Sequence, residues 1–203
     1  MRELDESPQR ILLVGDSMVE NLKFTLHHHA AARGHHLTVG IWYASTLQAW
    51  AGHSHMGELL SLSRATVVIM VNGASESPSL KDEVRVKLLR QLQRRIGDRP
   101  LLWIGPPTTP PFRSYDAWMA GMLPPNTYFP SSRLSLPRER DGIHPTPEAG
   151  ASWARAIVTW IERTSAHPIA LTPTDPSLLE QELAPPMTKV IPPPFAPSPD
   201  QSG

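Results

Sequence analysis

Short apolar runs alternate along the chain with longer segments in which apolar residues recur every three or four positions. The runs predict β-strands and the periodic segments predict helices. The expected strands cover residues 11–14, 37–42, 66–71, 101–104 and 127–130. Because strands and helices alternate, the pattern predicts strand–helix–strand units around a parallel sheet, and hence an α/β fold.

Three helices stand out in this pattern. The first is expected over residues 17–33, with Gly34 as its stop signal. Another has one apolar stripe opposite a charged face, formed by Leu80, Val84, Leu88, Leu92 and Ile96. The last begins with Thr146 as N-cap and Pro147 in the first turn. Its expected buried side consists of Ala149, Trp153, Ile157, Trp160 and Ile161.

The composition changes after Thr164, where proline, serine and threonine become frequent. Residues 1–164 are therefore expected to form one domain and residues 165–203 a Pro-rich tail. Proline removes backbone donors and favours extended conformations, so the tail is expected to be a flexible linker or to wrap on the surface. In the second case Leu178-Leu179 and Val190-Ile191 are its docking points, and the tail is a candidate contact arm for a protein partner.

Charge and cysteine content exclude several classes of function. Nineteen basic residues balance nineteen acidic ones, so the chain shows no electrostatic footprint for nucleic acid or an anionic membrane. The absence of cysteine excludes disulfides, a thiolate nucleophile and cysteine-based zinc sites. The charged N-terminus shows no signal peptide, and no apolar segment predicts a membrane span. A cytoplasmic protein fits these features, and so does a secreted or periplasmic one whose leader was removed.

The motif Gly15-Asp16-Ser17 directly follows the first expected strand and opens a helix. In open parallel sheets, ligands bind beyond the carboxyl ends of the strands. A backbone N–H in the first helical turn has no intrahelical acceptor, and the helix dipole favours a negative charge beside it. Ser17 is therefore a candidate nucleophile, with the simpler alternative that it only caps the helix.

Asp141 and His144 supply what a serine nucleophile lacks. A serine hydroxyl needs a base to take its proton, and histidine is the side chain suited to that task near neutral pH. The two residues lie three positions apart on a loop that contains glycine and proline. One turn can place the carboxylate against one imidazole nitrogen and leave the other facing Ser17. The combination favours a Ser–His–Asp triad over a loop-capping carboxylate and a surface histidine.

These motifs resemble those of the SGNH hydrolase superfamily, the GDSL-type esterases and lipases, over about residues 10–164. The run from Asp141 to Gly150 is especially similar to the family's final block, and Trp103 to Pro107 resembles its fourth-strand exit. The resemblance implies a three-layer α/β/α sandwich with a parallel, flavodoxin-like sheet of about five strands. It assigns catalysis to Ser17, Asp141 and His144, and no cofactor is expected.

The blocks that supply the family's oxyanion hole are altered here. The loop after the second expected strand lacks the usual glycine, so Ala44 or Ser45 is expected to give a backbone donor beside the Ser17 N–H. Asn72 is the candidate side-chain donor after the third strand, and a turn residue before Gly73 is the alternative.

Trp50 and Gly73 adjoin this hole and are the candidate substrate-binding residues. Trp42, Tyr43 and Trp50 would form an aromatic wall for a sugar ring or an acyl group, or alternatively pack in the core. The Pro-rich segment of residues 106–125 is interpreted as a lid or as a structural crossover. Its aromatic residues are Phe112, Tyr115 and Trp118.

Histidines cluster at residues 27–29, 35–36 and 53–55. Consecutive helical positions point in different directions and no carboxylate stands at a matching spacing, so helix-surface histidines are the better interpretation than a metal site.

The sequence thus predicts an esterase or deacetylase that acts through an acyl-serine intermediate on a small carboxylic ester, such as an O-acetyl group on a carbohydrate. The expected partner is that small-molecule or carbohydrate substrate. Two alternatives stay open: an O-acetyltransferase with the same triad, and a degenerate family member that binds a glycan or a protein without catalysis.

Overall fold

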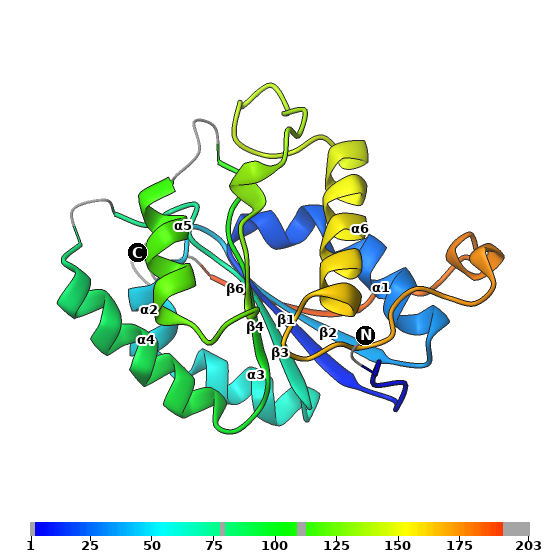
Figure 1. The fold of residues 1–203 in the computed structure, drawn as a ribbon, viewed down its shortest axis with the longest axis horizontal. Helices are drawn as coiled ribbons and strands as arrows, with labels where there is room; N and C mark the ends of the chain where they lie inside the picture. Colours follow the sequence, from blue (N-terminus) through cyan, green and yellow to red (C-terminus); the bar gives the residue numbers. More distant parts are fainter. Residues whose placement is uncertain (1–2, 78–79, 109–112, 193–203) are drawn as a thin grey trace, which may run out of the picture.

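The computed structural model describes residues 3–77, 80–108 and 113–192, which form a three-layer α/β/α sandwich (Figure 1). Within these ranges the sheet has six parallel strands in the order β5-β4-β3-β1-β2-β6. They are β1 (Arg10–Gly15), β2 (His36–Trp42), β3 (Val67–Val71), β4 (Leu101–Ile104), β5 (Tyr128–Phe129) and β6 (Met187–Ile191). The first five follow the flavodoxin-like order, which confirms the predicted fold class, and β6 adds a sixth strand.

Helices cover both faces of the sheet (Figure 1). One face carries the 3-10 helix η1 (Ser17–Asn21), α1 (Lys23–Ala32) and α6 (Pro147–Arg163). The other carries α2 (Leu47–Gly52), α3 (His55–Ser63), α4 (Asp82–Ile96) and α5 (Arg113–Met122). Alternate residues of β1 enter the two cores, Ile11 and Leu13 on the first face and Leu12 and Val14 on the second. Burial on both faces explains why β1, β3 and β4 are almost continuous apolar runs.

The predicted helices differ from the observed ones in two places. The first breaks at Leu22, where η1 gives way to α1. In α4 the expected stripe is buried at Leu92 and Ile96, whereas Val84 is 41% exposed and Arg85 is buried. A fixed spacing of four residues drifts away from a helix with 3.6 residues per turn, which is why the stripe was wrong at Val84.

The segment of residues 106–125 contains α5 and connects β4 to β5. Tyr115 and Met119 are buried in the core on that face, and Trp118 is half-buried against it. The described part is therefore a structural crossover, while Phe112 lies outside the described residues. Among the described helices, none combines the length and the hydrophobicity of a transmembrane span.

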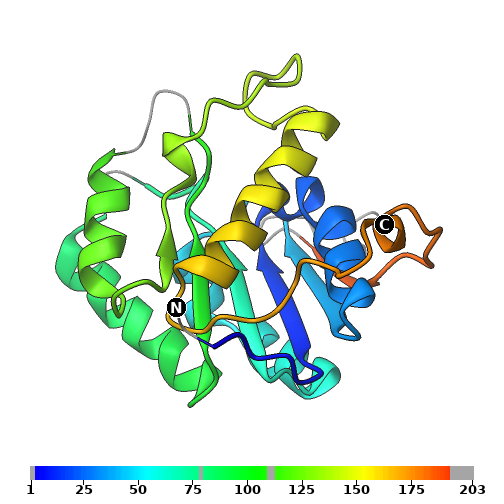
Figure 2. The same cartoon turned by 45° about the vertical axis from the view of Figure 1, so that its right-hand side comes forward.

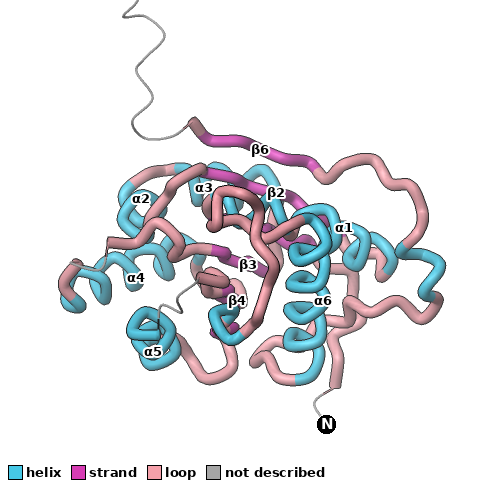
Figure 3. Tube along the Cα trace, turned by 90° about the horizontal axis from the view of Figure 1, so that it is seen from above, coloured by secondary structure: helices cyan, strands magenta, loops and turns pink. Residues whose placement is uncertain are grey.

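Residues 165–192, expected to be a tail, run along the domain (Figure 2). Ile169 and Leu171 are buried in the core beneath α1 and α6. Leu178 and Leu179 form part of the 3-10 helix η3 (Pro176–Leu179), none of whose residues is buried. Val190-Ile191 belongs to β6, which pairs with β2 at the edge of the sheet (Figure 3). Residues 193–203 of the expected tail lie outside the described residues.

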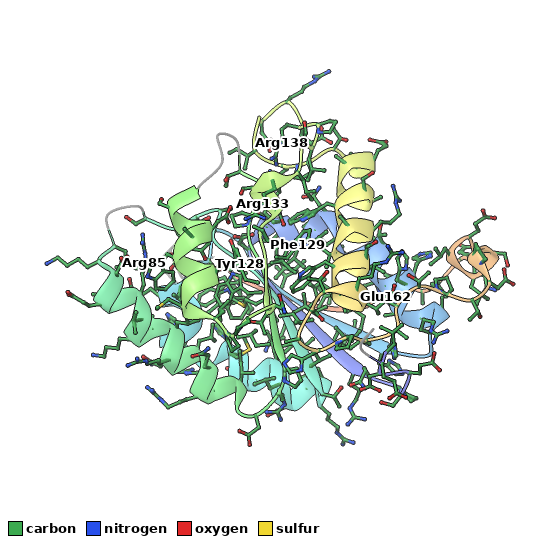
Figure 4. The ribbon with its side chains drawn as sticks, viewed as in Figure 1. Arg85, Tyr128, Phe129, Arg133, Arg138 and Glu162 are labelled. Atoms are coloured by element: carbon green, nitrogen blue, oxygen red, sulfur yellow. The ribbon has the colours of Figure 1, made fainter. Side chains whose placement is uncertain are left out.

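Side chains of α1, of α6 and of His35, which lies between α1 and β2, hold this segment in place. Glu162 on α6 (Figure 4) accepts hydrogen bonds from the backbone N–H of Leu171 (2.7 Å) and of Thr172 (2.5 Å). Four histidines each bond a carbonyl oxygen of the segment: His27 to Ala184, His28 to Leu179, His29 to Leu171 and His35 to Ala170. The expectation of surface histidines was wrong for His29 and His35, which are both 5% exposed. Within the described ranges, no group of three or more His, Asp or Glu side chains is placed to hold a metal ion.

The burial of His29 predicts a pH-dependent stability. Burial lowers the pKa of this imidazole, against an opposing effect of the bond to Leu171. Since the unfolded chain then binds the proton more readily, the contribution of His29 to the free energy of unfolding is expected to fall as the pH drops below about 6.5. His29→Asn keeps an N–H donor for the Leu171 carbonyl and should flatten this dependence, which urea unfolding between about pH 8 and pH 5 would measure. An unchanged slope in the variant would contradict the prediction.

Candidate active site

Ser17 is the first residue of η1 and lies at the carboxyl end of β1, in the middle of the sheet. Two residues earlier, the backbones of β1 and β3 approach each other so closely that only glycine fits. A Cβ at Gly15 would lie 1.8 Å from the carbonyl oxygen of Val71 on β3. The N-cap of η1 is Asp16, whose Oδ1 accepts from the Met18 N–H at 3.0 Å. The capping role considered for Ser17 therefore belongs to its neighbour, and the Ser17 hydroxyl serves another partner.

Asp16 is fully buried beside the nucleophile candidate. Burial raises the pKa of its carboxyl group to about 6, although the backbone N–H groups of Met18, Ala74 and Gly73 lower it. The carboxylate therefore lies between the start of η1, which it caps, and the loop after β3.

Asp141 and His144 lie on the loop that leads from the 3-10 helix η2 (Ser131–Arg133) to α6, above the sheet in Figure 1. His144 Nε2 lies 2.8 Å from Ser17 Oγ, and His144 Nδ1 lies 2.6 Å from Asp141 Oδ2. Asp141 Oδ1 accepts from the backbone N–H groups of Ile143 (2.8 Å) and His144 (3.0 Å). The bond from the His144 ring, together with these two amides, lowers the pKa of Asp141 to about 2. The structure therefore joins the three predicted residues in one hydrogen-bonded chain.

Local contacts fix the shape of this loop. Gly142 adopts a positive φ of 69°, which allows the tight turn between Asp141 and His144. The Glu139 N–H donates to the His144 carbonyl at 2.8 Å, and Arg138 Nη1 (Figure 4) donates to the Ile143 carbonyl at 2.9 Å. These two bonds hold the main chain of the loop at Ile143 and His144, from which the imidazole projects.

The site is open to solvent. The side chains of His144 and Asp141 retain 32% and 45% of their exposure. A groove of about 1050 Å³ lies elsewhere, between α5, β5 and α6, with Phe129 and Trp160 among its lining residues. Neither Ser17 nor the Asp141/His144 pair lines that groove.

The loop after β2 offers one of its two expected backbone donors. The Ser45 N–H donates to the Trp42 carbonyl at 3.0 Å and closes a tight turn, so it is removed from the expected oxyanion hole. Ala44, exposed within this turn with a φ of 55°, remains the candidate. A turn with positive φ at its third residue favours glycine, so Ala44 adopts a conformation that is strained for a residue with a side chain.

The side chain of Asn72 makes a hydrogen bond inside the protein. Its Nδ2 donates to the Ser45 carbonyl at 3.0 Å, and the side chain is fully buried. The main-chain carbonyl of Asn72 accepts from Trp103 Nε1 (3.2 Å) and from the Tyr115 hydroxyl (3.3 Å). Asn72 therefore ties the loops after β2 and β3 together, and its buried NH2 group uses one of its two N–H groups for the Ser45 carbonyl.

The two expected substrate-binding residues are also buried. Trp50 has no exposed surface; its Nε1 donates to Ser45 Oγ at 2.8 Å, and its ring packs edge-on against Trp42 at 5.4 Å. A Cβ on Gly73 would lie 2.6 Å from the Tyr115 ring. Trp50 and Gly73 therefore pack inside the protein and do not line a surface that a substrate could contact. The core-packing alternative is correct for Trp50 and Trp42.

Two residues near Ser17 were missed by the sequence analysis. Asn21 Nδ2 donates to the Pro145 carbonyl at 2.9 Å, and Glu20 Oε1 accepts from the Tyr43 hydroxyl at 2.7 Å. The only signal available was their position directly after the Gly-Asp-Ser motif, on the helix that Ser17 begins.

The left-handed conformation of Ala44 can be tested by Ala44→Gly. An L-residue at positive φ loses about 1–2 kcal/mol, and glycine loses somewhat less than this through its freer unfolded chain. The free energy of unfolding should therefore be unchanged or rise by about 0.5 kcal/mol. The matched control, Ala49→Gly in α2, should lower it by about 1 kcal/mol. Equal losses in urea unfolding of both variants would contradict the assigned turn.

Comparison with protein-family models and with curated proteins finds no match to this chain. Its function must therefore be argued from the hydrogen-bonded chain of Ser17, His144 and Asp141 and from the donors around it.

Proposed function

We propose that this protein is a serine esterase or deacetylase that hydrolyses a small carboxylic ester through an acyl-serine intermediate. The observation that carries the proposal is the unbroken series of contacts from Asp141 Oδ2 through His144 to Ser17 Oγ, at 2.6 and 2.8 Å. This arrangement activates serine on several unrelated folds, so its geometry supports the chemistry without help from the fold. Together with the Gly-Asp-Ser and Asp-x-x-His motifs, it favours membership of the SGNH superfamily.

In the proposed reaction, Ser17 Oγ attacks the ester carbonyl carbon while its proton passes to His144 Nε2. The Ser17 and Ala44 N–H groups are the candidate donors for the oxyanion. The ester C–O bond then breaks, and His144 gives its proton to the leaving alcohol. A water molecule attacks the acyl-serine with His144 again as base, which releases the carboxylic acid and returns the proton to Ser17.

Two further features support this assignment. The low pKa of Asp141 keeps its carboxylate charged at neutral pH, where it orients the imidazole and stabilises the imidazolium. The exposed position of His144 and Asp141 suits an acyl group carried on a larger, accessible body. An O-acetyl group on a carbohydrate is a substrate of this kind.

The test is hydrolysis of p-nitrophenyl acetate combined with labelling by a fluorophosphonate probe. We expect the probe to modify Ser17 and to abolish hydrolysis, and Ser17→Ala to show neither labelling nor activity. Labelling of Ser17 without ester hydrolysis would contradict the hydrolase. If the wild-type protein is neither labelled nor active, the acyl-serine intermediate itself is refuted.

A further inference from the structure

The helix that Ser17 begins carries two consecutive polar side chains that reach other loops of the site. Glu20 accepts from the Tyr43 hydroxyl, and Tyr43 directly precedes Ala44. Asn21 donates to the carbonyl of Pro145, and Pro145 directly follows His144. A single helical turn thereby contacts the segment of the base and the segment of the candidate oxyanion donor.

The contact through Asn21 fixes the base relative to the nucleophile. Its amide spans the gap between η1 and the loop end at Pro145 with a bond of 2.9 Å. Just beyond this bond, a Cβ on Gly150 of α6 would lie 2.6 Å from the Asn21 carbonyl oxygen and 3.0 Å from its Cβ. Asn21 therefore contacts the end of the His144 loop through its side chain and α6 through its main chain.

The contact through Glu20 acts on the other loop. Glu20 also pairs with Lys23 Nζ at 2.5 Å, which holds its carboxylate in place on η1. Tyr43 is 37% exposed, so burial alone does not fix its side chain. The hydrogen bond to Glu20 raises the pKa of the Tyr43 phenol, because a hydroxyl that donates to a carboxylate gives up its proton less readily. This bond joins the turn that presents Ala44 to the helix that presents Ser17.

We propose that Asn21 and Glu20 are positioning residues, Asn21 for His144 and Glu20, through Tyr43, for Ala44. The inference rests on the proposed function, since it assigns roles within the same site. Neither side chain has to touch the ester. A misplacement of about 1 Å at a reacting group can lower the rate about 100-fold, so contacts of this kind are large enough to matter.

The first test measures kcat and KM for p-nitrophenyl acetate and the rate of fluorophosphonate labelling in Asn21→Ala. We expect kcat and the labelling rate to fall together by about 10- to 100-fold, with KM within about threefold of wild type. The proton NMR signal of the His144–Asp141 hydrogen bond should persist, because that bond lies within one loop. A purely structural role would instead leave the labelling rate of the folded variant unchanged.

The second test uses variants of nearly unchanged shape. Asn21→Asp removes the donor at neutral pH and should match Asn21→Ala, which keeps the inference testable if the alanine variant does not fold. Tyr43→Phe deletes only the hydroxyl and should lower kcat about 3- to 10-fold. Ser152→Ala is the matched control, since it removes a similar side-chain bond to a carbonyl (Glu148, 3.0 Å) on the exposed face of α6 and should leave kcat unchanged.

The outcomes separate the inference from the proposed function. If the wild-type protein hydrolyses the ester and folded Asn21→Asp and Tyr43→Phe keep wild-type kcat and labelling rates, the positioning roles are overturned. If the wild-type protein itself neither hydrolyses the ester nor reacts with the probe, it is the proposed function that fails.

Discussion

Asp141→Asn is expected to lower the kcat for ester hydrolysis by about four orders of magnitude at neutral pH. Asp141 Oδ1 accepts two backbone N–H groups, so the carbonyl oxygen of the new amide must occupy that place. Its NH2 group would then face His144 Nδ1 and force the ring to carry its proton on Nε2. In that tautomer Nε2 donates to Ser17 and cannot take its proton.

Steady-state kinetics and nitrogen NMR of the His144 ring together test this prediction. The NMR spectrum should show the Nε2-protonated tautomer in Asp141→Asn and the Nδ1-protonated tautomer in the wild type. Asp141→Ala is the comparison, because it removes the carboxylate without imposing a tautomer and should be less impaired. If Asp141→Asn retains more than about a tenth of the wild-type kcat, Asp141 does not orient the base.

Ending the chain after Thr164 is expected to lower the free energy of unfolding by about 5 kcal/mol. The deletion removes Ile169, Leu171 and Ile191, none more than 4% exposed, and each contributes about 1.5–3 kcal/mol by burial. It also exposes the edge of β2, which pairs with β6 from Thr38 to Trp42. Such a loss is comparable to the whole stability of many domains, so the shortened chain should be largely unfolded.

Urea unfolding followed by circular dichroism measures this effect. A chain ending after Pro192 is the matched control, because it keeps every buried contact named above and should unfold with wild-type stability. An equal midpoint for the chain of residues 1–164 would show that those residues form an independent domain, as the composition predicted.

The sheet was largely predictable because four of its strands are buried on both faces. Runs such as residues 11–14 and 67–71 leave no polar position, so their pattern is unambiguous. Strand β6 gave no such signal. It lies between prolines, only Ile191 is buried, and an edge strand needs a hydrogen-bonded partner on one side only. Its pairing depends on β2, about 150 residues earlier, and is invisible in local sequence.

The candidate site, like the sheet, has parts that the local sequence predicts and parts that it does not. The spacing of Asp141 and His144 within one loop is a local property, and the sequence predicted their contact correctly. Whether an N–H group is free to bind an oxyanion depends instead on whether another acceptor lies within hydrogen-bond distance. The Ser45 N–H donates to the Trp42 carbonyl, and the Asn72 side chain donates to the Ser45 carbonyl. Neither contact can be inferred from the residue types. The direction of the Trp50 ring likewise depends on how α2 is rotated against the sheet.

The position of β6 also has a consequence for synthesis of the protein. Since β6 is the last strand of this sheet to leave the ribosome, β2 and the histidines of α1 are synthesised long before their final partners. Unpaired strand edges recruit strands from other chains. At about 5–20 residues per second, the interval between α6 and β6 lasts a second or more. Conditions that lengthen the interval between the emergence of α6 and that of β6 should therefore lower the soluble yield, and conditions that shorten it should raise the yield.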